Sequence, residues 1–117
     1  MGAEELRDAL RSTDEIELIV TGRTSGRESS RPVWFVEEGQ TLYLLPVTGS
    51  DSNWFKNIQG SPAIRLAADG TELSTNARPI DDAAKVGDVV EKFRGKYGAE
   101  QVRAYYSKLD VAVEVPL

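Results

Sequence analysis

Residues 15–36 read EIELIVTGRTSGRESSRPVWFV, and this stretch decides the fold. Residues 15–21 place isoleucine, leucine and valine at every second position, which is the periodicity of a strand with one buried face. Residues 21–30 are rich in Gly, Ser and Thr and predict a long hairpin loop. Residues 32–36 predict a second strand. The stretch therefore predicts two antiparallel strands joined by a polar loop.

The sequence on either side extends this hairpin into a small sheet. Further strands are predicted over residues 41–47, 63–68, 71–80 and 110–115. Helices are predicted over residues 3–12, from Ser50 or Asp51 to Gln59, from Asp81 or Asp82 to Arg94, and over residues 99–107. The strands follow one another too closely for parallel crossovers, so the sheet is expected to be antiparallel. Closing it would remove exposed edges. We predict one domain over residues 1–117, a mainly β (α+β), six-stranded antiparallel barrel with short flanking helices.

The composition limits the chemistry that this chain can perform. Among its 117 residues there is no Cys and no His, which excludes thiol nucleophiles, Ser-His-Asp triads and thiolate or histidine metal sites. The remaining acid–base side chains have ordinary pKa values far from neutrality. A cofactor that brings its own chemistry suits such a chain better than side-chain catalysis does. A chain of this length has a thin core, so we also expect dimerisation to stabilise it.

Charge is distributed unevenly along the chain. The formal net charge is −5, from 14 Lys and Arg against 19 Asp and Glu, which argues against nucleic acid or an anionic membrane as a partner. Residues 21–31 nevertheless hold three arginines against a single acid, and this basic segment predicts a bound anion. No apolar run is long enough to cross a bilayer, and residues 1–5 lack the order of a signal peptide. We expect a cytoplasmic protein.

The hairpin loop carries the features of a phosphate site. Gly22 and Gly26 allow the backbone to turn and to approach a ligand closely. The hydroxyls of Thr24 and Ser25, backbone N–H groups and forked guanidiniums all suit a phosphate. A solvated turn with scattered arginines is an equal alternative. The arginines concerned are Arg23, Arg27 and Arg31.

Two aromatic segments are further candidates. Trp54 offers a flat face to an aromatic ring; alternatively, Trp54 is a core anchor and Asn57 a local cap. Tyr105 and Tyr106 point about 100° apart on a helix, so we expect one of them to face a cleft. There it would close over a ligand or donate a hydrogen bond, whereas the alternative is simple packing. Taken alone, each position favours the alternative.

The order of these motifs resembles the deazaflavin-dependent nitroreductase family. That family belongs to the split β-barrel proteins related to pyridoxamine phosphate oxidase. The resemblance rests on TGRTSGR at residues 21–27, RPV at residues 31–33 and NWFKNI at residues 53–58, and it covers residues 15–66 well. It implies a homodimer that binds the deazaflavin coenzyme F-420, or FMN, in a groove at the barrel edge.

The resemblance also implies roles for individual residues. Those that would hold the cofactor phosphate are Arg23, Ser25, Gly26, Arg27 and Arg31. Those beside the ring system or on the bordering helix would be Pro32, Val33, Trp54 and Asn57. Either Tyr105 or Tyr106 would match tyrosines that line the substrate side.

We therefore expect a flavoprotein oxidoreductase in which F-420 or FMN delivers hydride to a quinone, a nitro compound or an enone. The chain would anchor the phosphate, orient the ring and exclude water. No residue is an evident proton donor, and Tyr105, Tyr106 or water are the candidates. Two alternatives remain: a non-catalytic carrier, sensor or haem-pocket relative on the same barrel, and a structural barrel with a basic surface loop.

Overall fold

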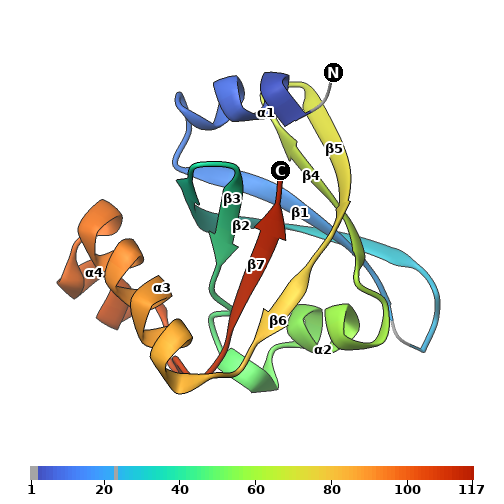
Figure 1. The fold of residues 1–117 in the computed structure, drawn as a ribbon. Coiled ribbons are helices and arrows are strands. Elements are labelled where there is room, and N and C mark those ends of the chain that lie inside the picture. Colours follow the sequence, from blue (N-terminus) through green and yellow to red (C-terminus); the bar gives the residue numbers. More distant parts are fainter. Residues whose placement is uncertain (1–2, 23) are drawn as a thin grey trace.

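Seven strands form one antiparallel sheet in the computed structural model, which describes residues 3–22 and 24–117 (Figure 1). The strands are β1 (Glu15–Thr21), β2 (Glu28–Glu38), β3 (Thr41–Leu44), β4 (Ala63–Ala68), β5 (Thr71–Asn76), β6 (Arg78–Ile80) and β7 (Ala112–Pro116). The helices are α1 (Ala3–Leu10), the short 3-10 helix η1 (Gly49–Asp51), α2 (Asn53–Gly60), α3 (Ala83–Tyr97) and α4 (Ala99–Tyr105). The order β5-β4-β1-β2-β3-β7-β6 is antiparallel at every pairing, as predicted.

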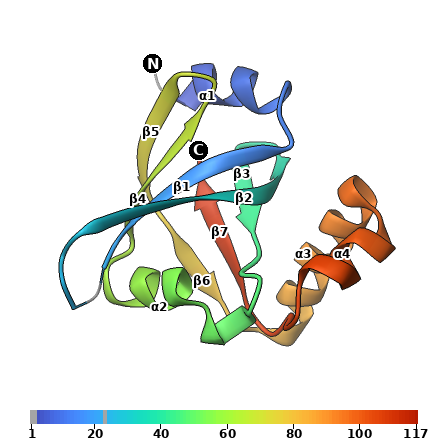
Figure 2. The same ribbon diagram turned by 180° about the vertical axis from the view of Figure 1, so that it is seen from behind.

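The sheet curls into a half-barrel, and its two end strands, β5 and β6, are consecutive in the chain (Figure 2). The prediction of one strand over residues 71–80 is wrong, since the strand is interrupted at Ala77. The N–H of Ala77 donates to the carbonyl oxygen of Pro62 at 2.8 Å. Residues before Ala77 pair with β4 and residues after it pair with β7. The predicted six strands are therefore seven.

The β1–β2 hairpin is longer than the sequence predicts. Its register places Thr21 opposite Glu28, so β2 begins at Glu28 and not at Pro32. The N–H of Gly22 donates to the carbonyl oxygen of Arg27 at 2.7 Å and closes the turn. The polar residues at the start of β2 are therefore strand residues, although their composition is that of a loop.

β2 has one open edge. β3 pairs with residues 35–38 of β2 alone, and among the described residues no strand pairs with the same edge of residues 28–34. Pro32, which has no N–H to donate, lies in this segment, where an edge strand tolerates proline. The barrel is thus split along the first part of β2, and this gap positions the site described below.

Two hydrophobic clusters stabilise the fold. One fills the barrel and includes Leu6, Leu18, Phe35, Leu42, Leu44, Phe55, Ile58 and Leu66. The other lies between the strands and the α3–α4 pair, which stands on one side of the barrel (Figures 1 and 2). Its buried members are Val36, Leu45, Val86, Val89, Val90, Phe93, Val102, Tyr106 and Ala112. The apolar spacing of α3 predicts this burial correctly.

The helix that follows β3 begins later than predicted. Neither Ser50 nor Asp51 caps it, because η1 occupies their position and α2 begins after Ser52, its N-cap. The side chains of Ser50 and Asp51 instead contact residues 108–110. A long-range polar contact has therefore replaced the local capping interaction that the sequence indicates.

The remaining boundaries differ by a few residues, which is usual for element ends. Asp82, one of the two predicted caps, accepts a hydrogen bond from the N–H of Lys85 at 3.1 Å. The elements that end or begin elsewhere than predicted are α1, which ends at Leu10, β3 at Leu44, α3 at Tyr97, α4 at Tyr105, and β7, which covers Ala112–Pro116. Within residues 3–22 and 24–117, no helix has both the length and the apolar character needed to span a membrane.

Candidate functional site: an aromatic pocket at the open edge of β2

A pocket of about 250 Å³ lies at the open edge of β2. Four segments that are distant in sequence meet there: β2, the chain after β3, the first turn of α2 and the end of α4. The lining residues are Arg31, Pro32, Val33, Trp34, Leu45, Val47, Trp54, Tyr105 and Tyr106. We call it the aromatic pocket. Consecutive residues of β2 line it because the pocket lies at the strand edge, where side chains from both faces of the strand border it.

Trp34 is the centre of the aromatic wall. Its ring stacks with Tyr97 at 4.3 Å and 9° and lies 4.4 Å from Tyr105 at 32°. Tyr106 meets it edge-on at 6.0 Å. Tyr105 is 39% exposed and forms the rim, whereas Tyr106 is 5% exposed and forms an inner wall. Offset and edge-to-face pairs of this kind add stability beyond the area they bury.

Both neighbouring tyrosines line the pocket, where the sequence predicts that only one faces a cleft. The prediction assumed a continuous helix through both residues. α4 ends at Tyr105, and Tyr106 has extended backbone angles, φ −98° and ψ 124°. The change of backbone conformation between the two residues turns both side chains towards the pocket.

Tyr97 ties this wall to the barrel. Its hydroxyl accepts the N–H of Phe35 at 3.1 Å and lies 2.8 Å from the carbonyl oxygen of Asp14 and 2.9 Å from that of Phe35. Burial raises the pKa of Tyr97 to about 12, so the phenol stays protonated and able to donate. The end of α3 is therefore held against the β1–β2 hairpin while the Tyr97 ring supports Trp34.

Replacing Tyr97 with phenylalanine is expected to lower the free energy of unfolding by about 1–3 kcal/mol. The change keeps the ring that stacks on Trp34 but leaves the N–H of Phe35 without its acceptor, and an unsatisfied buried donor costs about that much. Urea unfolding followed by circular dichroism measures the change. Tyr105→Phe is the matched control, with an expected change within about 0.5 kcal/mol, because Tyr105 is exposed. Equal losses in both variants would contradict the assigned role.

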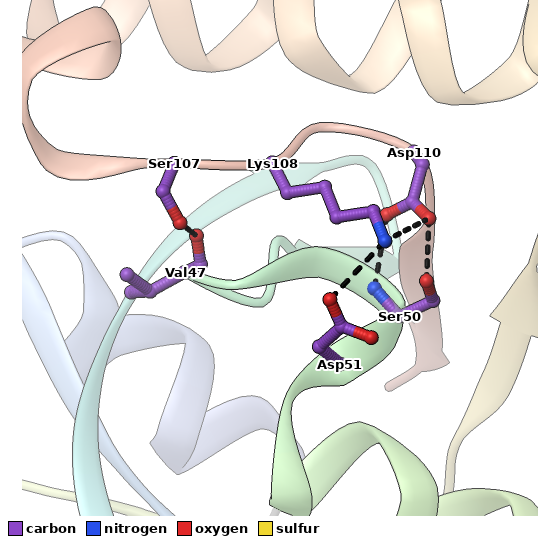
Figure 3. A network of polar contacts seen from close by, with 6 residues as sticks. All are labelled: Val47, Ser50, Asp51, Ser107, Lys108 and Asp110. Atoms are coloured by element: carbon purple, nitrogen blue, oxygen red, sulfur yellow. Dashed lines mark hydrogen bonds and ion pairs between the residues drawn. The ribbon is translucent and has the colours of Figure 1, made fainter.

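A polar clasp holds the chain after α4 against η1 (Figure 3). The N–H of Ser50 donates to Asp110 Oδ1 at 2.9 Å, and the Ser50 hydroxyl donates to Asp110 Oδ2 at 2.5 Å. Lys108 Nζ lies 3.2 Å from Asp51 Oδ2 and 3.7 Å from Asp110 Oδ2. The Ser50 hydrogen bonds are the main cause that holds the pKa of Asp110 below its usual value.

The clasp continues towards the pocket. The N–H of Ser107 donates to the carbonyl oxygen of Val47 at 2.9 Å, and its hydroxyl reaches the same oxygen at 3.2 Å. Because Val47 and Tyr106 both line the aromatic pocket, these bonds fix one wall of the pocket against another. Gly49 makes the close approach possible: its φ is +58°, and a Cβ atom there would lie 2.1 Å from Asp110 Oδ1.

The structure brings together some of the residues that the sequence singles out as a site. Those that line the aromatic pocket are Arg31, Pro32, Val33, Trp54, Tyr105 and Tyr106. Those that lie in the exposed turn of the β1–β2 hairpin are Thr24, Ser25, Gly26 and Arg27. This turn projects from the barrel on the side away from α3 and α4 (Figures 1 and 2). Asn57 is buried in α2 and does not line the pocket, and Arg23 lies outside the described residues.

Sequence reasoning missed three lining residues: Trp34, Leu45 and Val47. Trp34 directly follows the RPV motif, and its aromatic ring next to a predicted ligand segment is a signal that points to it. Nothing local distinguishes Leu45 and Val47 from other strand residues. They reach the pocket because the chain leaves β3 after Leu44.

The pocket has aromatic walls and a single charged group. No acidic side chain of the described residues lines it, and the guanidinium of Arg31 makes no hydrogen bond or ion pair with another described residue. Trp54 is 4% exposed, so most of this ring is fixed by the core. A flat aromatic cleft with one free guanidinium at its mouth suits a planar ligand that carries an anionic group.

Comparison with known proteins identifies the fold. A family model described as "Uncharacterized protein conserved in bacteria (DUF2255)" matches residues 6–113. The search of curated proteins finds no match. Among solved structures, the F420-H2 dependent reductase FDR-A has a TM-score of 0.67 and 18% identity, over 87% of this chain and 93% of its own.

Two further solved structures agree with this result. A structure described as a domain-swapped dimer has a TM-score of 0.69 and 16% identity, over 96% of this chain and 94% of its own. HutZ, the haem storage protein from Vibrio cholerae, has a TM-score of 0.72 and 12% identity, over 99% of this chain and 90% of its own. At these identities the likeness shows the fold alone.

Proposed function

The chain belongs to the DUF2255 family of bacterial proteins, and from this premise we propose that it is a flavin-type oxidoreductase with its cofactor in the aromatic pocket. The cofactor is F-420 or FMN. When bound, it supplies hydride transfer to a quinone, a nitro compound or an enone. The observation that carries the proposal is the meeting of Trp34, Trp54, Tyr105 and Tyr106 around one cleft, with the free guanidinium of Arg31 at its mouth.

Each group in the pocket has a task in this proposal. The exposed ring of Tyr105 and the accessible edges of the other rings contact the planar ring system, and the apolar Val33 and Leu45 exclude water from it. Arg31 binds the phosphate through charge-assisted hydrogen bonds. The hairpin turn offers further hydroxyls, N–H groups and a second guanidinium, on Thr24, Ser25, Gly26 and Arg27. At roughly 3.3 Å per residue along the extended chain, Arg27 is too far from Arg31 to bind the same phosphate, so in this proposal Arg31 alone holds it.

Two phenols are candidates for donating a hydrogen bond to the bound acceptor. Burial raises the pKa of Tyr106, so this phenol is neutral and keeps its proton near pH 7. Tyr105 stands at the exposed rim, where an incoming acceptor first meets the pocket. In this proposal either hydroxyl donates a hydrogen bond to the acceptor, and water completes the proton balance.

A second candidate function is non-catalytic binding of a flavin or a haem, because the same fold occurs in a haem storage protein. Haem fits this chain less well. The usual axial ligands are His, Cys, Met or Tyr, and the chain has no His, no Cys and one Met, at position 1. Tyr105 is the exposed phenol at the pocket, so a haem complex would depend on it. A flavin requires no such ligand.

The test is a parallel titration of the purified protein with F-420, FMN and haem, followed by tryptophan fluorescence. We expect micromolar or tighter binding of F-420 or FMN. Arg31→Ala is expected to weaken that binding about 10- to 100-fold, because a hydrogen bond to a charged group contributes about 1.5–3 kcal/mol. Arg11→Ala is the matched control, since Arg11 is an exposed arginine paired with Asp8 and away from the pocket. Unchanged affinity in Arg31→Ala would overturn the phosphate assignment.

Further measurements on the same samples separate the two candidate functions. Turnover with a quinone or nitroaromatic acceptor supports the oxidoreductase, whereas tight binding without turnover supports the carrier. Absence of binding by F-420, FMN and haem alike would overturn both. We also propose a homodimer in which the partner covers the open edge of β2, supported by the fold's occurrence in a domain-swapped dimer. Light scattering should then give about twice the chain mass of 12.8 kDa, and a monomer would contradict it.

A further inference from the structure

A second hollow, of about 360 Å³, lies between the end of α3, α4 and the chain that follows α4. Its lining residues are Arg94, Ala99, Val102, Arg103, Tyr106 and Leu109. We call it the arginine hollow. It shares Tyr106 with the aromatic pocket and no other lining residue. Tyr106 is therefore the one described residue that borders both spaces, and their other lining residues differ.

The charge of this hollow differs from that of the chain as a whole. The protein carries a formal net charge of −5, yet two arginines and no Asp or Glu of the described residues line the hollow. Arg94 forms an ion pair with Glu91, which lies outside the lining. Arg103 is exposed, and its guanidinium makes no ion pair or hydrogen bond with another described residue. At least one guanidinium is thus available to an anion.

The floor of the hollow is apolar. Val102 is 1% exposed and Tyr106 is 5% exposed, and Ala99 and Leu109 complete the surface between the arginines. The Tyr106 hydroxyl makes no hydrogen bond with a described residue, although its ring is almost fully buried. A small inorganic anion would leave this floor unused. An anion with an apolar body would satisfy the guanidinium and cover the floor at the same time.

We infer that the arginine hollow binds an amphipathic monocarboxylate, with its carboxylate on Arg103 and its apolar body over Ala99 and Leu109. The planar fork of a guanidinium matches the two oxygens of a carboxylate, which a point charge does not. Arg94, which is paired with Glu91, supplies a second, partly shared positive charge to the lining. Burial of the apolar body adds binding free energy to that of the carboxylate–guanidinium contact, so the preferred ligand needs both a carboxylate and an apolar body. This inference stands independently of the flavin proposal, because the two spaces are separate.

The probe is sodium octanoate, titrated into the full-length protein and followed by NMR chemical-shift changes and calorimetry. We expect saturable binding with one site per chain. Octan-1-ol and octylammonium, which keep the apolar body but lack the carboxylate, are expected to bind at least about tenfold more weakly, which corresponds to about 1.4 kcal/mol. Absence of saturable octanoate binding, or equal binding of the three probes, would overturn the inference.

The variants sharpen this test. Arg103→Ala is expected to weaken octanoate at least about tenfold, and Arg103→Lys to weaken it less, because lysine keeps the charge and loses the fork. The Arg103 side chain is exposed, so neither substitution should affect folding, and circular dichroism verifies this. Arg11→Ala controls for a general loss of positive charge and should leave binding unchanged. Wild-type affinity in Arg103→Ala, or an equal loss in Arg11→Ala, would contradict the assignment.

A competition experiment tests whether the site is separate. Octanoate affinity is measured in the presence of saturating FMN, or of inorganic phosphate if FMN does not bind. We expect a change of less than about twofold, since only Tyr106 is common to the two spaces. Displacement of octanoate would show that it occupies the aromatic pocket and would overturn the second site without touching the flavin proposal.

Discussion

Replacing Phe93 with alanine is expected to lower the free energy of unfolding by about 3–5 kcal/mol, a large part of the total stability of a small domain. Phe93 is fully buried on α3, and its ring lies 5.9 Å from that of Tyr97 and 6.0 Å, edge-on, from that of Tyr106. Removing it deletes the contact surface that supports both tyrosines. The rings behind Trp34 would then lose their fixed positions, so the aromatic pocket would also be disturbed.

Urea unfolding, followed by circular dichroism and tryptophan fluorescence, measures this loss. Phe93→Leu is the control, because it keeps an apolar side chain of intermediate volume and should cost clearly less than the alanine variant. A loss below about 1 kcal/mol in Phe93→Ala would show that α3 packs loosely and would contradict the core position assigned to this ring. Pocket ligands should bind the alanine variant more weakly than the leucine variant.

Gly49→Ala is expected to cost about 2–4 kcal/mol. Part of this is the positive φ of +58°, which costs an L-residue about 1–2 kcal/mol. The rest comes from the clasp, because the new Cβ atom would lie 2.1 Å from Asp110 Oδ1 and 2.9 Å from the carbonyl oxygen of Lys108. Asp110 must then move away from Ser50, and both hydrogen bonds between them are lost.

Gly39→Ala is a closely matched control for this variant. Gly39 has a φ of +62°, but a Cβ atom there would meet nothing within 4 Å. Its cost should therefore be that of the backbone conformation alone. The difference between the two variants in urea unfolding isolates the contribution of the clasp. Equal losses would mean that the contact between the 107–110 segment and η1 contributes nothing to stability.

Much of the fold could be predicted from short-range patterns. Alternation in residues 15–21 identifies β1, and the apolar spacing in residues 83–97 identifies the buried face of α3. The interruption at Ala77 could not be predicted in this way, because residues on both sides of it are extended. It depends on β4 and β7, which lie on opposite sides in sequence and pair with different halves of the segment.

The candidate site was predictable in its parts but not in its assembly. The RPV motif and Trp54 line the pocket together, whereas the hairpin turn that contains Arg27 projects away from α4. Two features decided this outcome: the extension of β2 back to Glu28, and the end of α4 at Tyr105. Both depend on tertiary contacts that override the local sequence. The composition of residues 28–31 predicts a loop, and that of residues 105–107 predicts a continued helix.

The position of β7 in the sheet has a consequence for how the protein folds during its synthesis on the ribosome. β7 lies between β3 and β6, so Ala112–Pro116 supplies the pairing partner of both. Until these residues have left the exit tunnel, the β1–β2 hairpin and β4–β5 can pair locally, but the barrel has no closing strand. Closure therefore requires the synthesis of β7, and it joins segments far apart in sequence, which slows folding. During that interval the edges of β3 and β6 are open to other chains, the period in which a nascent barrel most needs a chaperone.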